Sequence, residues 1–236
     1  VPDINNFDIT FCYYSAKGVI MKNFLIVTIL SIFLSISIFA QETKIMFNTQ
    51  EFSPFNYTKN GKVSGPVYDV INEVCLLNGF VCSFKSYQWK RSQDIVKLGK
   101  ADALFVVGKN KKREKWLNFS LPIIKTEYGF FGQDTNKLNY KKISDIQGYN
   151  IGVFGPSNTS LSLKNIDKQL KKQRLKSLRI RVLSDDVPVF KQLSENKNSL
   201  QAVFSNKDVG NSIIKENGLN NLRYLGKQRE LDYYIA

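Results

Sequence analysis

The side chain with the clearest chemical purpose is an arginine in a cationic loop. Residues 101–107 form a short apolar run after a glycine, which is typical of a buried strand. The loop that follows, residues 108–114, is rich in lysine and contains Arg113 near its end. Open α/β sheets bind ligands just beyond the carboxyl ends of their strands. A guanidinium holds a carboxylate through two parallel hydrogen bonds, so the pattern predicts that Arg113 binds an anionic group.

Several other kinds of chemistry are absent from the sequence. None of the 236 residues is a histidine, which removes histidine triads, imidazole general bases and histidine metal sites. The motifs around the expected cleft contain no acid/base pair that would support catalysis. We therefore expect a binding protein and not an enzyme, with no metal and no cofactor.

The overall composition is that of a globular protein, with 43% hydrophobic and 23% charged residues. The net charge of +14 would suit nucleic acid or an anionic membrane. However, lysine and asparagine are spread through nearly every expected loop, and no DNA- or RNA-binding motif is present. We therefore interpret the charge as a solvated, lysine-rich surface and expect no nucleic-acid partner.

The first forty residues have the features of a secretory signal preceded by an extra segment. Residues 1–20 begin with valine and show no periodicity, so we interpret them as a non-native or artefactual upstream segment. Lys22 then gives a positive start, residues 24–39 are apolar and uncharged, and Ala40 is small. We expect a signal peptide at 21–40, cleavage after Ala40 and export to the periplasm. An uncleaved membrane anchor is the alternative.

The rest of the chain alternates strand-like and helix-like segments, which favours an α/β fold. Strands are expected at 44–48, 81–87, 101–107, 123–131, 151–154, 180–183, 200–204, 222–225 and 233–236. Helices are expected between them, and two of these begin near Asp186 and Asp208. The apolar face expected for the first helix consists of Val67, Val70, Ile71 and Val74. The helix after 151–154 is expected to face inward with Leu163, Ile166 and Leu170.

Several short motifs follow one another in a distinctive order. Residues 99–132 contain GKADA, a strand, a polar loop ending in arginine, FSLP and an extended segment with aromatics. Further motifs are FSPF at 52–55, GPVYDV at 65–70, Trp89, ISDIQG at 143–148 and IGV at 151–153. In their order and spacing, these motifs resemble the family 3 extracellular solute-binding proteins. Those proteins are the polar amino-acid-binding components of bacterial ABC importers.

The resemblance implies a two-lobed periplasmic binding protein fold of type II, with a two-stranded hinge. Residues 41–130 would form lobe 1, residues 131–231 lobe 2, and residues 232–236 an incomplete return strand to lobe 1. Family members continue with at least one more helix on lobe 1, so the resemblance also implies a truncated C-terminal part.

The same resemblance implies a function and partners. The protein would capture a small polar or anionic ligand in the periplasm, as a monomer, and hand it to an inner-membrane ABC permease. Two alternatives use the same fold. One is a ligand-sensing domain, and the other is an enzyme similar to cyclohexadienyl dehydratase.

The resemblance also implies ligand-binding roles for residues that have simpler interpretations. Phe55 would form an aromatic wall of the site, or it packs in the core. Trp89 would stack on the ligand, or it caps the core of its lobe. Asp69 would contact the ligand, or it complements the dipole of its helix. Ser157 would contact a carboxylate, or it only caps a helix.

One departure from the family changes the expected ligand. Family members carry an acidic residue in lobe 2 that binds the α-amino group, and Asn206 occupies the matching position here. An amide cannot neutralise an ammonium group. Because Arg113 is retained while the acid is lost, we expect small carboxylates or other anions to bind at least as well as amino acids.

Cys75 and Cys82 are the only cysteines after the expected signal peptide. Export would place them in an oxidising compartment, where disulfides persist. A disulfide between them and two buried free thiols both remain open, because the geometry of the pair cannot be read from sequence.

Overall fold

The computed structural model of this chain describes residues 42–236. The upstream segment and the signal peptide expected over residues 1–40 lie outside the described residues. In the part of the chain that is described, no helix is both long enough and apolar enough to cross a membrane.

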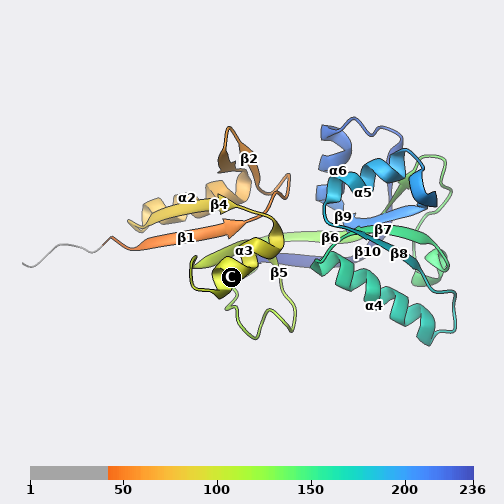
Figure 1. The fold of residues 1–236 in the computed structure, drawn as a ribbon, viewed down its shortest axis with the longest axis horizontal. Coiled ribbons are helices and arrows are strands. Elements are labelled where there is room, and N and C mark those ends of the chain that lie inside the picture. The colour runs from red at the N-terminus through yellow and green to blue at the C-terminus, as the bar shows by residue number, and fades with distance from the viewer. Residues whose placement is uncertain (1–41) are drawn as a thin grey trace, which may run out of the picture. The chain divides into compact units, whose positions relative to one another are not determined.

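The described residues form one mixed sheet of eight strands, in the order β4-β1-β5-β10-β6-β9-β7-β8 (Figure 1). These strands are β1 (Lys44–Thr49), β4 (Val81–Ser86), β5 (Ala103–Gly108), β6 (Ile124–Gln133), β7 (Asn150–Phe154), β8 (Arg179–Leu183), β9 (Ala202–Asn206) and β10 (Leu222–Ile235). A separate hairpin pairs β2 (Tyr57–Lys59) with β3 (Lys62–Ser64). The helices are α2 (Pro66–Leu77), α3 (Trp89–Lys97), α4 (Asn158–Lys172), α5 (Asp186–Ser194) and α6 (Lys207–Glu216), with 3-10 turns at Ile143–Ile146 and Lys197–Ser199. The α/β class expected from the sequence is confirmed.

Two long strands connect two lobes. Lobe 1 contains the parallel strands β4, β1 and β5 with α2 and α3, and lobe 2 contains the parallel strands β8, β7 and β9 with α4, α5 and α6. Strands β6 and β10 pair with each other antiparallel. The end of β10 also pairs with β5 in lobe 1, and β6 pairs with β9 in lobe 2. These two strands are therefore the hinge.

Strand β10 differs from the sequence-based expectation of two short strands at 222–225 and 233–236. It is continuous from Leu222 to Ile235, with irregular pairing between Tyr224 and Gly226 and again between Lys227 and Arg229. The polar residues in its middle pair only with β6, and most of them are exposed. Because the middle of this strand is exposed to solvent, it can be polar and still be a strand. The prediction of two separate strands was therefore wrong.

Helix α2 lies on lobe 1 with a different face inward from the one expected. Val67, Ile71 and Cys75 are buried at a spacing of four residues, whereas Val70 and Val74 are 59% and 51% exposed. The expected inward positions were therefore correct for two of the four residues. Cys75 also forms a disulfide with Cys82 on β4. Of the two alternatives left open by the sequence, the disulfide is therefore confirmed.

Lobe 2 packs helices on both faces of its part of the sheet. Figure 1 shows α4 on one side of strands β7 and β8, with α5 and α6 on the other. The helix α4 buries Leu163, Ile166 and Leu170, as its spacing predicted. The sheet contributes aromatic side chains to this core, among them Phe130 and Phe204 with ring centroids 4.9 Å apart.

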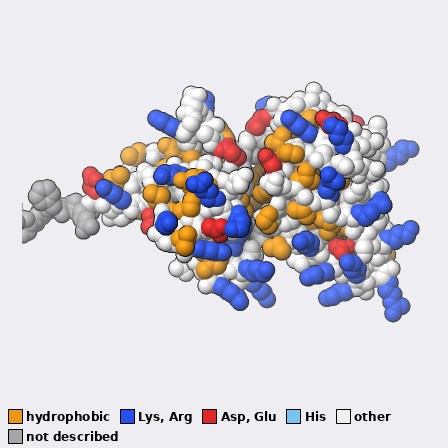
Figure 2. Space-filling view, in the orientation of Figure 1, with side chains coloured by type: hydrophobic (Ala, Val, Ile, Leu, Met, Phe, Trp, Pro, Cys, Tyr) orange, Lys and Arg blue, Asp and Glu red, His pale blue; other side chains and the backbone are white. Residues whose placement is uncertain are grey.

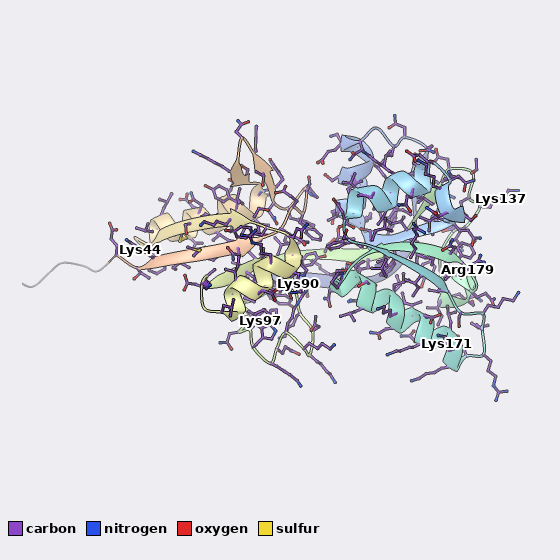
Figure 3. The ribbon with its side chains drawn as sticks, viewed as in Figure 1. Lys44, Lys90, Lys97, Lys137, Lys171 and Arg179 are labelled. Atoms are coloured by element: carbon purple, nitrogen blue, oxygen red, sulfur yellow. A yellow bond between two sulfur atoms is a disulfide. The ribbon has the colours of Figure 1, made fainter. Side chains whose placement is uncertain are left out.

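The positive charges are distributed over the surface of both lobes. Figure 2 shows lysine and arginine side chains scattered across the visible face and not gathered into one continuous patch. The labelled side chains in Figure 3 are all exposed and extend from both lobes: Lys44, Lys90, Lys97, Lys137, Lys171 and Arg179. This distribution agrees with a solvated surface, as expected from the sequence.

Candidate ligand-binding cleft

A cleft of about 1590 Å³ lies between the two lobes. Lobe 1 lines it with residues 50–54 after β1 and residues 86–89 at the end of β4. Lobe 2 lines it with residues 184–187 after β8 and with one face of α6, which follows β9. These segments all follow the carboxyl ends of parallel strands, where open α/β sheets bind their ligands.

Arg113 is a buried cation next to this cleft. Its side chain is 7% exposed, and its guanidinium carbon lies 4.9 Å from the ring centroid of the lining residue Trp89. Its Nη1 donates a hydrogen bond of 2.6 Å to the carbonyl oxygen of Gly108. Among residues 42–236, no carboxylate forms an ion pair with it. Burial lowers the pKa of Arg113, which reflects the cost of holding this charge away from water.

The loop that carries Arg113 has a defined local structure. The backbone N–H of Arg113 donates to the backbone oxygen and to Oδ1 of Asn110, both at 3.0 Å. Asn110 in turn donates from Nδ2 to Oδ1 of Asn158, at the start of α4, over 3.0 Å. This contact brings the amino end of α4 against the Arg113 loop.

Trp89 fits both interpretations that the sequence left open. It begins α3, lines the cleft and lies against the guanidinium of Arg113. It is also only 7% exposed and packs in a small core cluster with Leu104, Val107 and Leu117. Because the core fixes the ring, Trp89 can position Arg113 as well as contact a ligand.

The aromatic side chains of the loop after β1 lie in different places, some on the cleft and one in the core only. Phe55 lies in the core of lobe 1, with its ring centroid 5.9 Å from that of Tyr233 on the hinge, and it is not among the lining residues. Phe52 and Tyr57 do line the cleft. Phe55 is thus a core residue, whereas Phe52 and Tyr57 are the aromatic residues of this loop that line the cleft.

Two further candidates lie outside the cleft lining. Asp69 is exposed in the first turn of α2, where its charge complements the helix dipole. Ser157 caps α4, because its Oγ accepts from the N–H of Ser160 at 3.1 Å and donates to the carbonyl oxygen of Phe154 at 2.6 Å. Asp69 thus lies at the start of its helix and Ser157 caps its helix, and a ligand contact of either residue stays a prediction.

Asn206 is used by the protein itself. The side chain is 1% exposed, and its Oδ1 accepts from the N–H groups of Asp208 and Val209, at 2.9 and 3.1 Å. Its Nδ2 donates to Oγ1 of Thr126 on β6 at 3.0 Å. Asn206 therefore caps α6 and attaches it to the hinge.

The cleft lining is acidic, which the sequence analysis did not anticipate. Its acidic residues are Glu51, Asp185, Asp186, Asp208 and Glu216, and Lys215 is the cation in the same lining. This contrasts with the net charge of +14 for the whole chain. The sequence does contain a signal for these acids. Asp186 and Asp208 follow the carboxyl ends of expected strands, and this is the same position that pointed to Arg113. The sequence pattern alone identifies both residues only as the starts of helices.

Asp186 has the most perturbed carboxyl group in the cleft. Burial raises the pKa of Asp186 to about 7, and the negative charge of the neighbouring Asp185 adds to this effect. The pKa of Tyr233 is also raised, mainly by burial, with a contribution from the charge of Asp186. A group with such a pKa, in a cleft, is a candidate for a functional role.

Hydrogen bonds also cross the cleft from lobe to lobe. The Oγ of Ser53 lies 2.8 Å from the Oγ of Ser212 and donates to Oε1 of Glu216 at 2.7 Å. Both partners lie on α6 in lobe 2. These hydrogen bonds and the contact between Asn110 and Asn158 connect the two lobes.

Two α/β lobes, a two-stranded hinge and a cleft at the strand ends define the periplasmic binding protein fold, and solved structures share it. A histidine kinase sensor domain with similarity to periplasmic binding proteins has a TM-score of 0.72 and 16% identity, covering 83% of this chain and 82% of that one. An ancestral arginine-binding protein bound to arginine has a TM-score of 0.70 and 20% identity, covering 83% and 84%. A truncated, arginine-bound ArgBP from T. maritima has a TM-score of 0.68 and 15% identity, covering 81% and 86%.

Residues 45–208 match the family described as bacterial extracellular solute-binding proteins, family 3, and the chain belongs to this family. No curated protein matches the sequence. The membership confirms the resemblance seen in the short motifs.

Proposed function

We propose that this protein is a periplasmic solute-binding protein that captures a small polar ligand through a carboxylate and delivers it, as a monomer, to an inner-membrane ABC permease. The observation that carries the proposal is Arg113, a buried guanidinium beside the cleft that has no carboxylate partner among residues 42–236. A buried charge is costly unless it is paired, so a ligand carboxylate would complete this site.

The surroundings of Arg113 support an anion at this position. Gly108, which accepts the hydrogen bond from Arg113, lies so close to α4 that a Cβ there would be 2.6 Å from Nδ2 of Asn158. The amino end of a helix of 15 residues therefore lies beside the guanidinium. Helix amino ends carry partial positive charge and free N–H groups that favour anions. Arg113 and α4 thus contribute charge of the same sign from the two lobes.

Calorimetry on two matched ligands tests the role of Arg113. L-arginine has a carboxylate, and agmatine is the same molecule without it; the arginine-bound relatives make this pair a reasonable starting point. Removing one partner of a buried charged pair costs about 2 to 5 kcal/mol, which corresponds to roughly 30-fold to several-thousand-fold in affinity. We expect Arg113→Met to weaken the binding of amino acids by such a factor and agmatine to bind poorly to the wild type.

The matched control is Arg91→Met. Arg91 is an exposed arginine on α3 that also stacks on an aromatic ring, 4.7 Å from the centroid of Tyr87. We expect this variant to keep the wild-type affinity. Thermal unfolding shows whether both variants are folded. Equal affinities of folded Arg113→Met and wild-type protein would contradict the proposed role of Arg113.

A sensing role is the second candidate, because a histidine kinase sensor domain shares the fold over 83% of this chain. The neighbouring genes distinguish the two roles: permease genes would support an importer, and a kinase gene would support a sensor. Product analysis after incubation with each bound ligand tests the dehydratase-like alternative, and we expect the ligand to be recovered unchanged.

A further inference from the structure

The loop that carries Arg113 is contacted at two positions by one side chain of the opposite lobe. Asn158 is the first residue of α4 in lobe 2, and its Oδ1 accepts a hydrogen bond of 3.0 Å from Nδ2 of Asn110. Its own Nδ2 lies against Gly108, because a Cβ on Gly108 would be 2.6 Å from that atom. The amide of Asn158 therefore lies against both Gly108 and Asn110.

The same two residues of the loop also hold Arg113. The carbonyl oxygen of Gly108 accepts the hydrogen bond of 2.6 Å from Nη1 of Arg113. Oδ1 of Asn110 accepts from the backbone N–H of Arg113 and from that of Lys112, both at 3.0 Å. Gly108 thus fixes the guanidinium and Asn110 fixes the backbone behind it. A residue that presses on both of them acts on the position of Arg113.

Neither helix capping nor cleft lining explains the side chain of Asn158. Ser157 caps α4 through its own hydroxyl group. Asn158 is not among the residues that line the cleft. Within residues 42–236, its side chain forms one hydrogen bond, the one to Asn110. The contact with the Arg113 loop is therefore the role that the structure shows for this amide.

This contact joins parts of the protein that a hinge allows to separate. The Arg113 loop follows β5 in lobe 1, and Asn158 begins α4 in lobe 2. In the described part of the chain, the strands β6 and β10 pair with both lobes and connect them. Two lobes on such a hinge open and close about it. Opening would take Asn158 away from Asn110 and Gly108, while the hydrogen bonds inside the loop would stay.

We propose that Asn158 is a positioning residue for Arg113, which fixes the Arg113 loop only when the lobes close, so that the ligand carboxylate is held firmly in the closed form alone. This inference rests on the proposed function above and adds a residue of lobe 2 to the same site. An interaction that forms only after the ligand has entered slows its release and leaves its capture unchanged. Asn158 therefore acts on the dissociation rate of the ligand.

Stopped-flow fluorescence measures the two rates separately. The probe is the standard L-amino acid that binds the wild-type protein most tightly when all twenty are compared by calorimetry. Trp89 supplies the signal, because it lines the cleft and lies 4.9 Å from the guanidinium of Arg113. We expect Asn158→Ala to raise the dissociation rate roughly fivefold, the factor that one hydrogen bond contributes. The association rate should stay within about twofold.

Asn165→Ala is the matched control. Asn165 is an exposed asparagine on the same helix, so the substitution is chemically the same but removes no contact with the loop. We expect it to change neither rate by more than about twofold. Thermal unfolding shows whether each variant is folded.

Gly108→Ala gives a second readout, which a purely structural role of Asn158 in its own helix would not produce. The added methyl group would displace the amide of Asn158, whereas Cε1 of Tyr233 lies at an ordinary contact distance of 3.6 Å. We therefore expect Gly108→Ala alone to raise the dissociation rate about as much as Asn158→Ala does. In the double variant the hydrogen bond is already lost and the methyl group has room. Its dissociation rate should equal that of Asn158→Ala within about twofold, whereas independent residues would give additive effects.

Four results would overturn a claim, and they are distinguishable. An unchanged dissociation rate in folded Asn158→Ala overturns the role of Asn158 and leaves the proposed function intact. A fall in the association rate as large as the rise in the dissociation rate overturns its restriction to the closed form. Additive effects in the double variant overturn the link between Gly108 and Asn158. Absence of binding of all twenty amino acids by folded wild-type protein overturns the proposed function itself.

Discussion

Replacement of Asp186 by asparagine is expected to stabilise the unliganded protein, and the gain should depend on pH. The pKa of Asp186 is about 7, against the ordinary value of 3.8. Each pKa unit corresponds to about 1.4 kcal/mol, so the ionised carboxylate destabilises the folded state by up to about 4 kcal/mol above pH 7. The side chain keeps part of its surface in water, and we therefore expect about half of this amount.

The sign follows from the direction of the change in pKa. Between about pH 4 and pH 7 the folded state binds the proton of Asp186 more tightly than the unfolded state, so wild-type stability falls as the pH rises through this window. Asp186→Asn lacks this proton equilibrium. The variant should therefore resemble the wild type near pH 4 and exceed it by about 2 kcal/mol at pH 8, which is roughly 4 to 8 °C in Tm for a domain of this size.

Thermal unfolding of both proteins at pH 4, 5, 6, 7 and 8, without ligand, measures this difference. The other titratable groups that face Asp186 are Asp185 on its own helix and Tyr233 on β10, while Asp208 and Lys215 of α6 line the same cleft. These groups are unchanged in the variant. A difference in Tm that is the same at pH 5 and pH 8, or a less stable variant at pH 8, would refute the reasoning.

Three other predictions concern packing, the disulfide and the closed cleft. Ile71→Ala should lower the free energy of unfolding by about 2 to 5 kcal/mol in a denaturant titration, because Ile71 is buried. Val74→Ala, on the exposed face of the same helix, should change it by no more than about 0.5 kcal/mol. Equal losses of stability in the two variants would show that the helix packs with another face. Reduction of the Cys75–Cys82 disulfide should lower stability by roughly 2 to 3 kcal/mol, because the bridge closes a short loop, and an unchanged Tm with reductant would contradict this. Ser53→Ala removes both hydrogen bonds to α6, and each such bond contributes about 1 kcal/mol. We therefore expect a larger radius of gyration of the unliganded variant in small-angle scattering and a few-fold weaker ligand affinity. Identical scattering curves of variant and wild type would show that these bonds do not hold the lobes together.

The sequence predicted correctly those segments in which the apolar residues of the pattern are also the buried residues. The buried strand before Arg113 is apolar along its length, and helix α4 repeats Leu163, Ile166 and Leu170 at helical spacing, so both were predictable. Helix α2 was predicted with its wrong face partly inward because Val70 and Val74 are apolar but exposed. An exposed valine follows the same spacing as a buried one, and only the tertiary structure distinguishes them.

Of the residues in and beside the cleft, Arg113 in lobe 1 could be predicted from the sequence, whereas Asp186 in lobe 2 could not. Arg113 could be located because a cation after a buried strand has few other interpretations. Asp186 could not be separated from Asp185 and Asp208, since an acid at the start of a helix is common for capping and for the helix dipole. What distinguishes Asp186 is the lack of a partner among residues 42–236, and partners that come from distant parts of the chain are invisible in a sequence.

The measurement that tests the central claim most directly is a crystal structure of the wild-type protein with the L-amino acid that calorimetry finds to bind most tightly. Our account predicts that the ligand carboxylate forms hydrogen bonds of about 2.7 to 2.9 Å to the guanidinium of Arg113, beside Trp89. A ligand that lies in the cleft with its carboxylate bound elsewhere, and with Arg113 still unpaired, would contradict the account.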